Sequence, residues 1–239
     1  GVYQFMIRKY GMERIGSYSN FNRYVKINKL KPAAKTHGRP RYEKGPGEQA
    51  QVDWKEDISI ASRYGEIFVI NVLHTTLKYS RYGYLEMSIQ KRFDDVARGL
   101  INSFKAFGGV PKELLFDNMA TVSNTNVKPK RPTDLIIQMS KEFGFNIKLC
   151  KSRSPQTKGT VEARNKIIDW IRAYEGEFET LEDLEDILEM INKSMNTNIN
   201  HETKMSPMAL FYKEKEYLHP FVTIVVFLNC TLVHTILSS

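Results

Sequence analysis

Three acidic residues in the middle of the chain, Asp53, Asp117 and Glu162, have the side chains and spacing to do chemistry together. Asp53 lies in the β-rich run QVDWKE, Asp117 follows the apolar run LLF, and Glu162 opens a predicted helix after the polar loop SPQTKG. Carboxylate oxygens are the ligands that Mg²⁺ prefers. Two such ions about 3.5–4 Å apart can activate water and stabilise the leaving oxygen of a phosphodiester. If the fold brings the three acids together, they predict a site for two Mg²⁺ ions.

Each acid also has a purely structural interpretation. A carboxylate in a buried strand is costly unless it binds a metal or pairs with a cation, so Asp53 could pair with an arginine. Asp117 could cap the turn that follows it, and Glu162 could interact with the N-terminus of its own helix. Four further acids are predicted to be surface charges: Asp57, Asp94, Asp95 and Asp169.

The hydrophobic pattern predicts the elements that must position these acids. Residues 49–60, 65–76 and 81–89 are β-rich runs separated by short turns, which predicts an antiparallel meander. A helix over Phe93–Phe107, a strand near 112–118, a helix over 135–145 and a strand over 146–150 follow. A long helix from about 160 to 173, an acidic helix over 181–195 and a helix capped by Ser206 with Pro207 at its first position complete the series. The acids converge if the first and fourth strands are neighbours.

The net charge of +8 is concentrated at one end of the chain. Residues 1–49 hold eleven Lys/Arg against three Asp/Glu, which accounts for the whole excess, whereas residues 127–172 hold eleven basic and four acidic residues. Residues 173–189 hold eight acidic residues and no basic one. A basic arm and a basic stretch favour a polyanionic partner, most commonly nucleic acid, although a solvated basic surface would give the same counts.

The N-terminal thirty residues are predicted to form two short helices around Gly11 and Gly16, with Ser17 or Ser19 as an N-cap. This pattern is compatible with the end of a helix-turn-helix module, and any small helical pair would share it. Residues 31–47 are rich in proline, glycine and basic residues, which is typical of an extended linker that could follow a phosphate backbone or act as a plain spacer.

The number and spacing of the cysteines argue against a disulfide framework and against a structural zinc site. Cys150 and Cys230 lie 80 positions apart, with no CxxC pair and no His/Cys cluster. The sequence therefore predicts neither a disulfide framework nor a structural zinc site, and a reducing cytoplasm is the expected compartment. The chain does not start with a signal-peptide pattern.

Three sequence blocks resemble a known family. GPGEQAQVDW, KELLFDN and SRSPQTKGTVEARNK are similar, in this order, to the signature blocks of integrase-core transposases, specifically the IstA-like protein of insertion sequences that also encode a helper ATPase. The third block is also similar to retroviral integrases. The resemblance spans about residues 3–220, and Asp117 and Glu162 lie 45 positions apart.

The resemblance implies an α/β fold, a ribonuclease H-like integrase core with a β-β-β-α-β-α-β-α mixed sheet. It also implies a DDE-type transposase that performs 3′-end cleavage of transposon ends and strand transfer into target DNA, in other words DNA integration and recombination. Asp53, Asp117 and Glu162 match the catalytic triad, which would hold two Mg²⁺ ions, with Mn²⁺ as a possible substitute. No covalent protein intermediate and no organic cofactor is expected.

Further expectations concern DNA and partners. Lys166 lies one turn beyond Glu162 and is expected to contact a phosphate, unless it only pairs with that acid. The other expected DNA contacts are Lys158, Gln156, Arg23, Arg39 and Arg41, with simple solvation as the alternative. The expected partners are the transposon ends, target DNA, further copies of the chain on DNA and a helper AAA+ ATPase. A cytoplasmic, nucleoid-associated protein without a membrane partner is predicted.

The predicted organisation has five parts: residues 1–30 as a partial helix-turn-helix-like segment, 31–47 as a basic linker, 48–175 as the catalytic core, 176–220 as C-terminal helices, and 221–239 as a hydrophobic tail. The tail lacks Asp, Glu, Lys and Arg and is interpreted as a truncated or out-of-frame end, with a marginal membrane span or a plain strand as alternatives. The rival function is a catalytically silent DNA-binding remnant. A host ribonuclease H-like nuclease is disfavoured by the basic N-terminal module.

Overall fold

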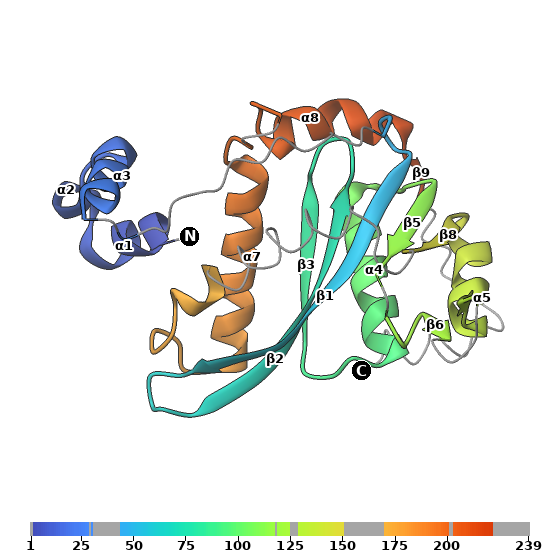
Figure 1. The fold of residues 1–239 in the computed structure, drawn as a ribbon, viewed down its shortest axis with the longest axis horizontal. Coiled ribbons are helices and arrows are strands. Elements are labelled where there is room, and N and C mark those ends of the chain that lie inside the picture. Colours follow the sequence, from blue (N-terminus) through green and yellow to red (C-terminus); the bar gives the residue numbers. More distant parts are fainter. Residues whose placement is uncertain are drawn as a thin grey trace.

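A mixed five-stranded sheet forms the centre of the protein (Figure 1). The computed structural model describes residues 2–28, 30, 44–117, 119–124, 129–150, 170–200 and 203–221. The sheet order is β3-β2-β1-β5-β8. Its strands are β1 (Gln49–Ala61), β2 (Ile67–Leu77), β3 (Gly83–Ser88), β5 (Glu113–Phe116) and β8 (Asn146–Leu149).

The pairing confirms the predicted meander and meets the condition under which the acids can converge. β1, β2 and β3 form an antiparallel meander, and β5 pairs with β1 in parallel, so the first and fourth of the predicted strands are neighbours. β8 then pairs with β5 in parallel. The register of β1 against β2 shifts between Lys55 and Ile58, where Asp57 adopts a φ of 54°. Such a bulge bends its strand and increases the local twist, and the β1–β2 hairpin extends beyond the rest of the sheet (Figure 1).

Helices cover both faces of the sheet (Figure 1). On one face, α4 (Phe93–Phe107) and α5 (Asp134–Phe143) pack into a core with Val52, Trp54 and Leu114. On the other face, α7 (Leu181–Thr197) packs into a second core with strand residues such as Ile60 and Leu85. Both α4 and α5 end at glycines in the left-handed conformation, as glycine permits at low cost.

The N-terminal segment forms three helices rather than the predicted two: α1 (Val2–Tyr10), α2 (Met12–Ile15) and α3 (Tyr18–Ile27). Gly11 and Gly16, both at positive φ, separate all three, and Ser17 caps α3 by accepting the amide of Asn20. The segment contacts the core through α1, where the Phe5 ring lies 5.2 Å from that of Tyr174.

The C-terminal part of the described chain returns to the end of the sheet. Thr180 caps α7, and Ser206 caps α8 (Pro207–Glu214) with Pro207 at its start, as predicted. A short 3₁₀ turn, η1 (Lys215–Tyr217), leads to β9 (His219–Pro220), which pairs with β4 (Gly109–Val110). Another small pair joins β6 (Ser123–Asn124) and β7 (Arg131–Pro132). Two-residue strands show no sequence period, so neither pair was predicted.

Glu214, at the end of α8, fixes this helix to the sheet. The side chain is fully buried and accepts hydrogen bonds from the amides of Gly47 at 3.0 Å and Ser80 at 2.9 Å. Gly47 lies just before β1, and Ser80 lies in the turn between β2 and β3. One carboxylate therefore joins three separate segments of the fold.

The hydrophobic tail beyond residue 221, including Cys230, lies outside the described residues. Among the described residues, no helix combines the length and apolar character needed to cross a membrane.

Candidate functional site

Asp53 on β1 and Asp117, directly after the adjacent parallel strand β5, occupy equivalent positions. Val52 on β1 pairs with Phe116 on β5, and the amide of Asp117 donates to the Val52 carbonyl at 3.3 Å. Asp53 directly follows Val52, and Asp117 directly follows Phe116. Both aspartate side chains therefore lie at the same level and on the same face of the sheet. The structure thus brings together two of the three predicted catalytic acids.

Cys150 extends this row by one strand. Phe116 pairs with Leu149 on β8, and the amide of Cys150 donates to the Phe116 carbonyl at 3.0 Å. Burial, followed by the charge of Asp117 and with a smaller contribution from Asp53, raises the pKa of the Cys150 thiol. The thiol therefore stays protonated near neutral pH and is a poor nucleophile. Sequence reasoning gave Cys150 no role, although NIKLC ends its strand as LLFD ends the neighbouring one.

Asp53 is paired with a cation inside the protein. The ammonium group of Lys55 contacts the Oδ2 atom of Asp53, and the two side chains are only 1% and 7% exposed. The structural interpretation of Asp53 expected an arginine, and the partner is instead a lysine two residues along the same strand face. Sequence reasoning missed Lys55. Its signal was the i, i+2 spacing of opposite charges in a buried strand.

His74 on β2 lies directly opposite Asp53. Burial is the main reason that the pKa of His74 falls to about 3; the nearby charge of Lys55 lowers it further, while Asp53 acts against it. The imidazole is therefore neutral at physiological pH, and its Nε2 atom lies 2.6 Å from the Thr76 hydroxyl oxygen. His74 was not predicted as part of the site, because a single histidine in a strand carries no spacing signal.

The fit to a metal rests on the chemistry of these donors. Asp53 and Asp117 offer adjacent hard oxygen ligands, and the contact with Lys55 shows that an Asp53 oxygen can accept a positively charged neighbour. Within the part of the chain that the structure describes, no group of three or more His, Cys, Asp or Glu is arranged to hold a metal ion. The third predicted ligand, Glu162, lies outside the described residues.

The predicted DNA contacts are mostly beyond what the structure describes. Five of them lie outside the described residues: Lys166, Lys158, Gln156, Arg39 and Arg41. Arg23 is exposed on α3. Of the four acids predicted to be surface charges, Asp57 and Asp94 are exposed, whereas Asp169 lies outside the described residues.

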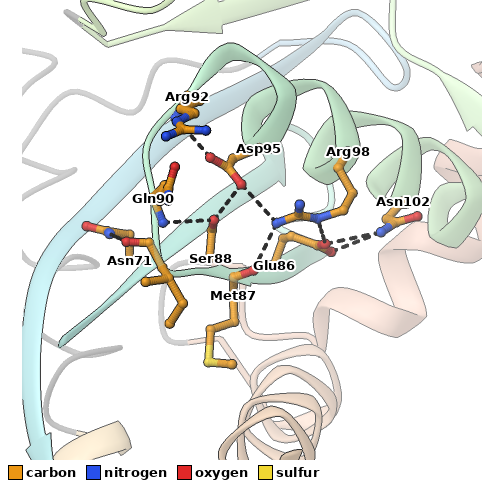
Figure 2. Close-up of polar contacts among 10 residues, drawn as sticks. Asn71, Glu86, Met87, Ser88, Gln90, Arg92, Asp95, Arg98 and Asn102 are labelled. Atoms are coloured by element: carbon orange, nitrogen blue, oxygen red, sulfur yellow. Dashed lines mark hydrogen bonds and ion pairs between the residues drawn. The ribbon is translucent and has the colours of Figure 1, made fainter. Parts of the chain in front are cut away.

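Asp95 contradicts that prediction, since its side chain is buried at the start of α4 (Figure 2). It accepts hydrogen bonds from the Ser88 hydroxyl at 2.7 Å, the Arg92 amide at 2.9 Å and Arg98 Nη2 at 3.2 Å. Arg98 also donates to Glu86 at 3.1 Å. The sequence pattern did not reveal this capping role. These contacts join α4 to the end of β3 and use the polar groups internally, so this cluster is structural.

Comparisons with known proteins agree with the resemblance in sequence. The chain is 36% identical over 184 residues to the transposase of insertion sequence IS232 from Bacillus thuringiensis subsp. berliner, covering 75% of this chain and 42% of that protein. It is also 36% identical over 178 residues to a putative transposase of IS5376 from Geobacillus stearothermophilus, covering 73% and 44% respectively. The chain thus spans less than half the length of these curated relatives. No family model matches the sequence.

Two solved structures share the fold. The catalytic core domain of BIV integrase aligns with a TM-score of 0.51 at 16% identity, covering 71% of this chain and 97% of that domain. A chain of the simian T-cell lymphotropic virus intasome, solved in complex with the PP2A regulatory subunit B56 gamma, aligns with a TM-score of 0.55 at 11% identity, covering 89% and 74% respectively. The resemblance in sequence is therefore confirmed: the chain is similar over 75% of its length to an insertion-sequence transposase, and its mixed sheet has the ribonuclease H-like fold of integrase catalytic cores.

Proposed function

We propose that this chain carries the catalytic core of a DDE-type DNA transposase, which cleaves the 3′ ends of its element and transfers them into target DNA. The observation that supports this most directly is the matching placement of Asp53 on β1 and of Asp117 directly after β5. In open α/β sheets, ligands commonly bind beyond the carboxyl ends of the strands. Glu162, in the third sequence block, supplies the remaining acid of the proposed triad.

Asp53, Asp117 and Glu162 would hold two Mg²⁺ ions, or Mn²⁺ in their place. When bound, such ions lower the pKa of a water molecule and stabilise the charge that develops on phosphorus oxygens. The chain's own part is to fix the carboxylates. β1 lies between β2 and β5, so hydrogen bonds on both sides hold the segment that carries Asp53. Burial raises the pKa of Cys150 and keeps its thiol protonated near neutral pH, so Cys150 itself is not expected to act as a nucleophile.

The DNA contacts belong to the same proposal. Gln156, Lys158 and Lys166 flank Glu162 in sequence and are suited to contact phosphates near the scissile bond. The basic N-terminal part, with Arg23 exposed on α3, would add sequence-independent attraction to the DNA backbone. Assembly of several copies on DNA, a helper ATPase and a nucleoid location complete the proposed setting.

The test is nicking of a labelled duplex that carries the element's own end, with Mg²⁺ or Mn²⁺. The unchanged chain should nick the end, and Asp117→Asn should lower the rate by at least about a hundredfold, because electrostatic stabilisation of a transition state is commonly worth that much. Asp94→Asn makes the same charge change at an exposed position on α4 and should nick normally. Nicking by Asp117→Asn at the normal rate would refute the proposed site. Binding without nicking by all three proteins would favour a silent DNA-binding protein.

A further inference from the structure

The buried pair of Lys55 and Asp53 is unusual because both partners have left water. The Lys55 side chain is 1% exposed, and its ammonium contacts the Oδ2 atom of Asp53. Removing a lysine and an aspartate from water costs several kcal/mol per ion, so such pairs are weak contributors to stability. A pair that stabilises little and occupies a proposed metal ligand calls for a functional explanation.

Lys55 lies in an apolar part of the sheet. Lys55 lies opposite Val72 on β2, just before the bulge that leads to Ile58, and both of these neighbours are buried apolar residues. The four-carbon stem of a lysine packs well against such residues, while its flexible end can move over several ångströms. The Lys55 ammonium is therefore close enough to hold Asp53 and flexible enough to leave it.

We propose that Lys55 is an internal counter-cation that competes with the divalent metal for Asp53, and so sets how tightly the site binds metal. This inference rests on the proposed function, because it takes Asp53 as a metal ligand. Two cations that share one carboxylate in a poorly solvated space repel each other strongly. Metal binding then requires the Lys55 ammonium to move off Asp53, and a site without this lysine binds metal more tightly. Lys55 acts as a positioning residue, since it affects chemistry only through Asp53.

Metal binding to the whole chain without DNA tests this directly. Free Mn²⁺, measured by electron paramagnetic resonance during titration, gives the affinity for the unchanged chain and for Lys55→Met, which keeps a similar length without the charge. We expect Lys55→Met to bind Mn²⁺ about tenfold more tightly, within the usual range of coupling between two binding events. Lys91→Met is the matched control, because Lys91 pairs with Glu56 and Asp57 near the surface. Its affinity should stay within about twofold of that of the unchanged chain.

A second measurement needs no variant and therefore does not depend on whether Lys55→Met folds. Nitrogen-15 spectra of lysine ammonium groups should show Lys55 as a slowly exchanging signal without metal, since its protons are buried against Asp53. Addition of Mg²⁺ should shift this signal or broaden it away. A Lys55 signal that stays unchanged while Mg²⁺ saturates the site would overturn the proposal, as would equal Mn²⁺ affinities for Lys55→Met and the unchanged chain.

Asp117→Asn separates the two levels of inference. If it weakens Mn²⁺ binding while Lys55→Met has no effect, the metal site stands and the role of Lys55 is refuted. If neither the unchanged chain nor Lys55→Met shows Mn²⁺ binding that depends on Asp117, both the metal site and the competition are refuted. Tighter binding by Lys55→Met that Asp117→Asn then abolishes supports both.

Discussion

Replacement of Glu214 by glutamine should destabilise the whole sheet, although Glu214 lies on a helix far along the chain from β1. Its carboxylate accepts the amides of Gly47 at 3.0 Å and Ser80 at 2.9 Å in a fully buried position. The glutamine side chain has the same shape but a single acceptor oxygen, so its NH₂ group must face one of these amides. Hydrogen bonds to charged groups contribute about 1.5–3 kcal/mol each, and a buried unsatisfied amide costs about 1–3 kcal/mol. Glu214→Gln should therefore lower the free energy of unfolding by about 2–4 kcal/mol.

Urea denaturation followed by circular dichroism measures this loss. Glu216→Gln is the matched control, since Glu216 is exposed in the turn that follows α8 and should change stability by less than about 0.5 kcal/mol. The slope of the unfolding free energy against urea concentration should stay the same, because the surface exposed on unfolding does not change. If Glu214→Gln and Glu216→Gln unfold at the same urea concentration, the two bonds to Glu214 do not hold the sheet, and the reasoning is wrong.

Two other predictions concern the sheet face that carries Asp53. Asn196, at the end of α7, accepts a hydrogen bond from the Gly83 amide at 2.9 Å and donates one to the Gly83 carbonyl at 2.8 Å. Asn196→Ala should therefore lower the free energy of unfolding, measured by urea denaturation, by about 2–4 kcal/mol. A loss under about 0.5 kcal/mol would contradict this role. The pKa of His74 is lowered to about 3 in the folded state, so the unfolded chain binds the additional proton as pH falls. Stability from this group is present above pH 6.5 and is lost by about 1.4 kcal/mol per pH unit between pH 6.5 and about 3. His74→Gln should make the fall of the unfolding free energy with decreasing pH shallower over this range. His219→Gln, at an exposed histidine, should leave that slope unchanged. Equal slopes for the two variants would refute the lowered pKa of His74.

The sequence predicted the fold well where the hydrophobic pattern was long. The meander and the helix over Phe93–Phe107 were both correct, because each has a clear period or a fixed turn. The errors arose where tertiary contacts decide whether a side chain is buried. Asp95 looks like one of two surface acids in DD, and only the fold places its side chain against Ser88 and the first turn of α4.

For the proposed site, sequence reasoning singled out the acids but not their neighbours. Asp53 and Asp117 could be found because each lies in or ends an apolar strand and matches a family block. Lys55 offered only its i, i+2 spacing from Asp53, and His74 offered no spacing signal, since its place opposite Asp53 depends on the register between β1 and β2. The hydrophobic pattern and the turn set most of the register, but they did not reveal the shift between Lys55 and Ile58.

The two aspartates of the site are held with unequal strength. Asp53 lies inside β1, which has a neighbouring strand on each side, whereas Asp117 follows the four-residue strand β5 and its own amide reaches back to Val52. A change in the position of β1 therefore moves both carboxylates together and preserves the spacing that the proposed pair of metal ions would require. A change confined to β5 or β8 moves Asp117 alone. Substitutions at the β5–β8 side should thus impair metal binding more than substitutions of equal cost to stability in the distal β1–β2 hairpin.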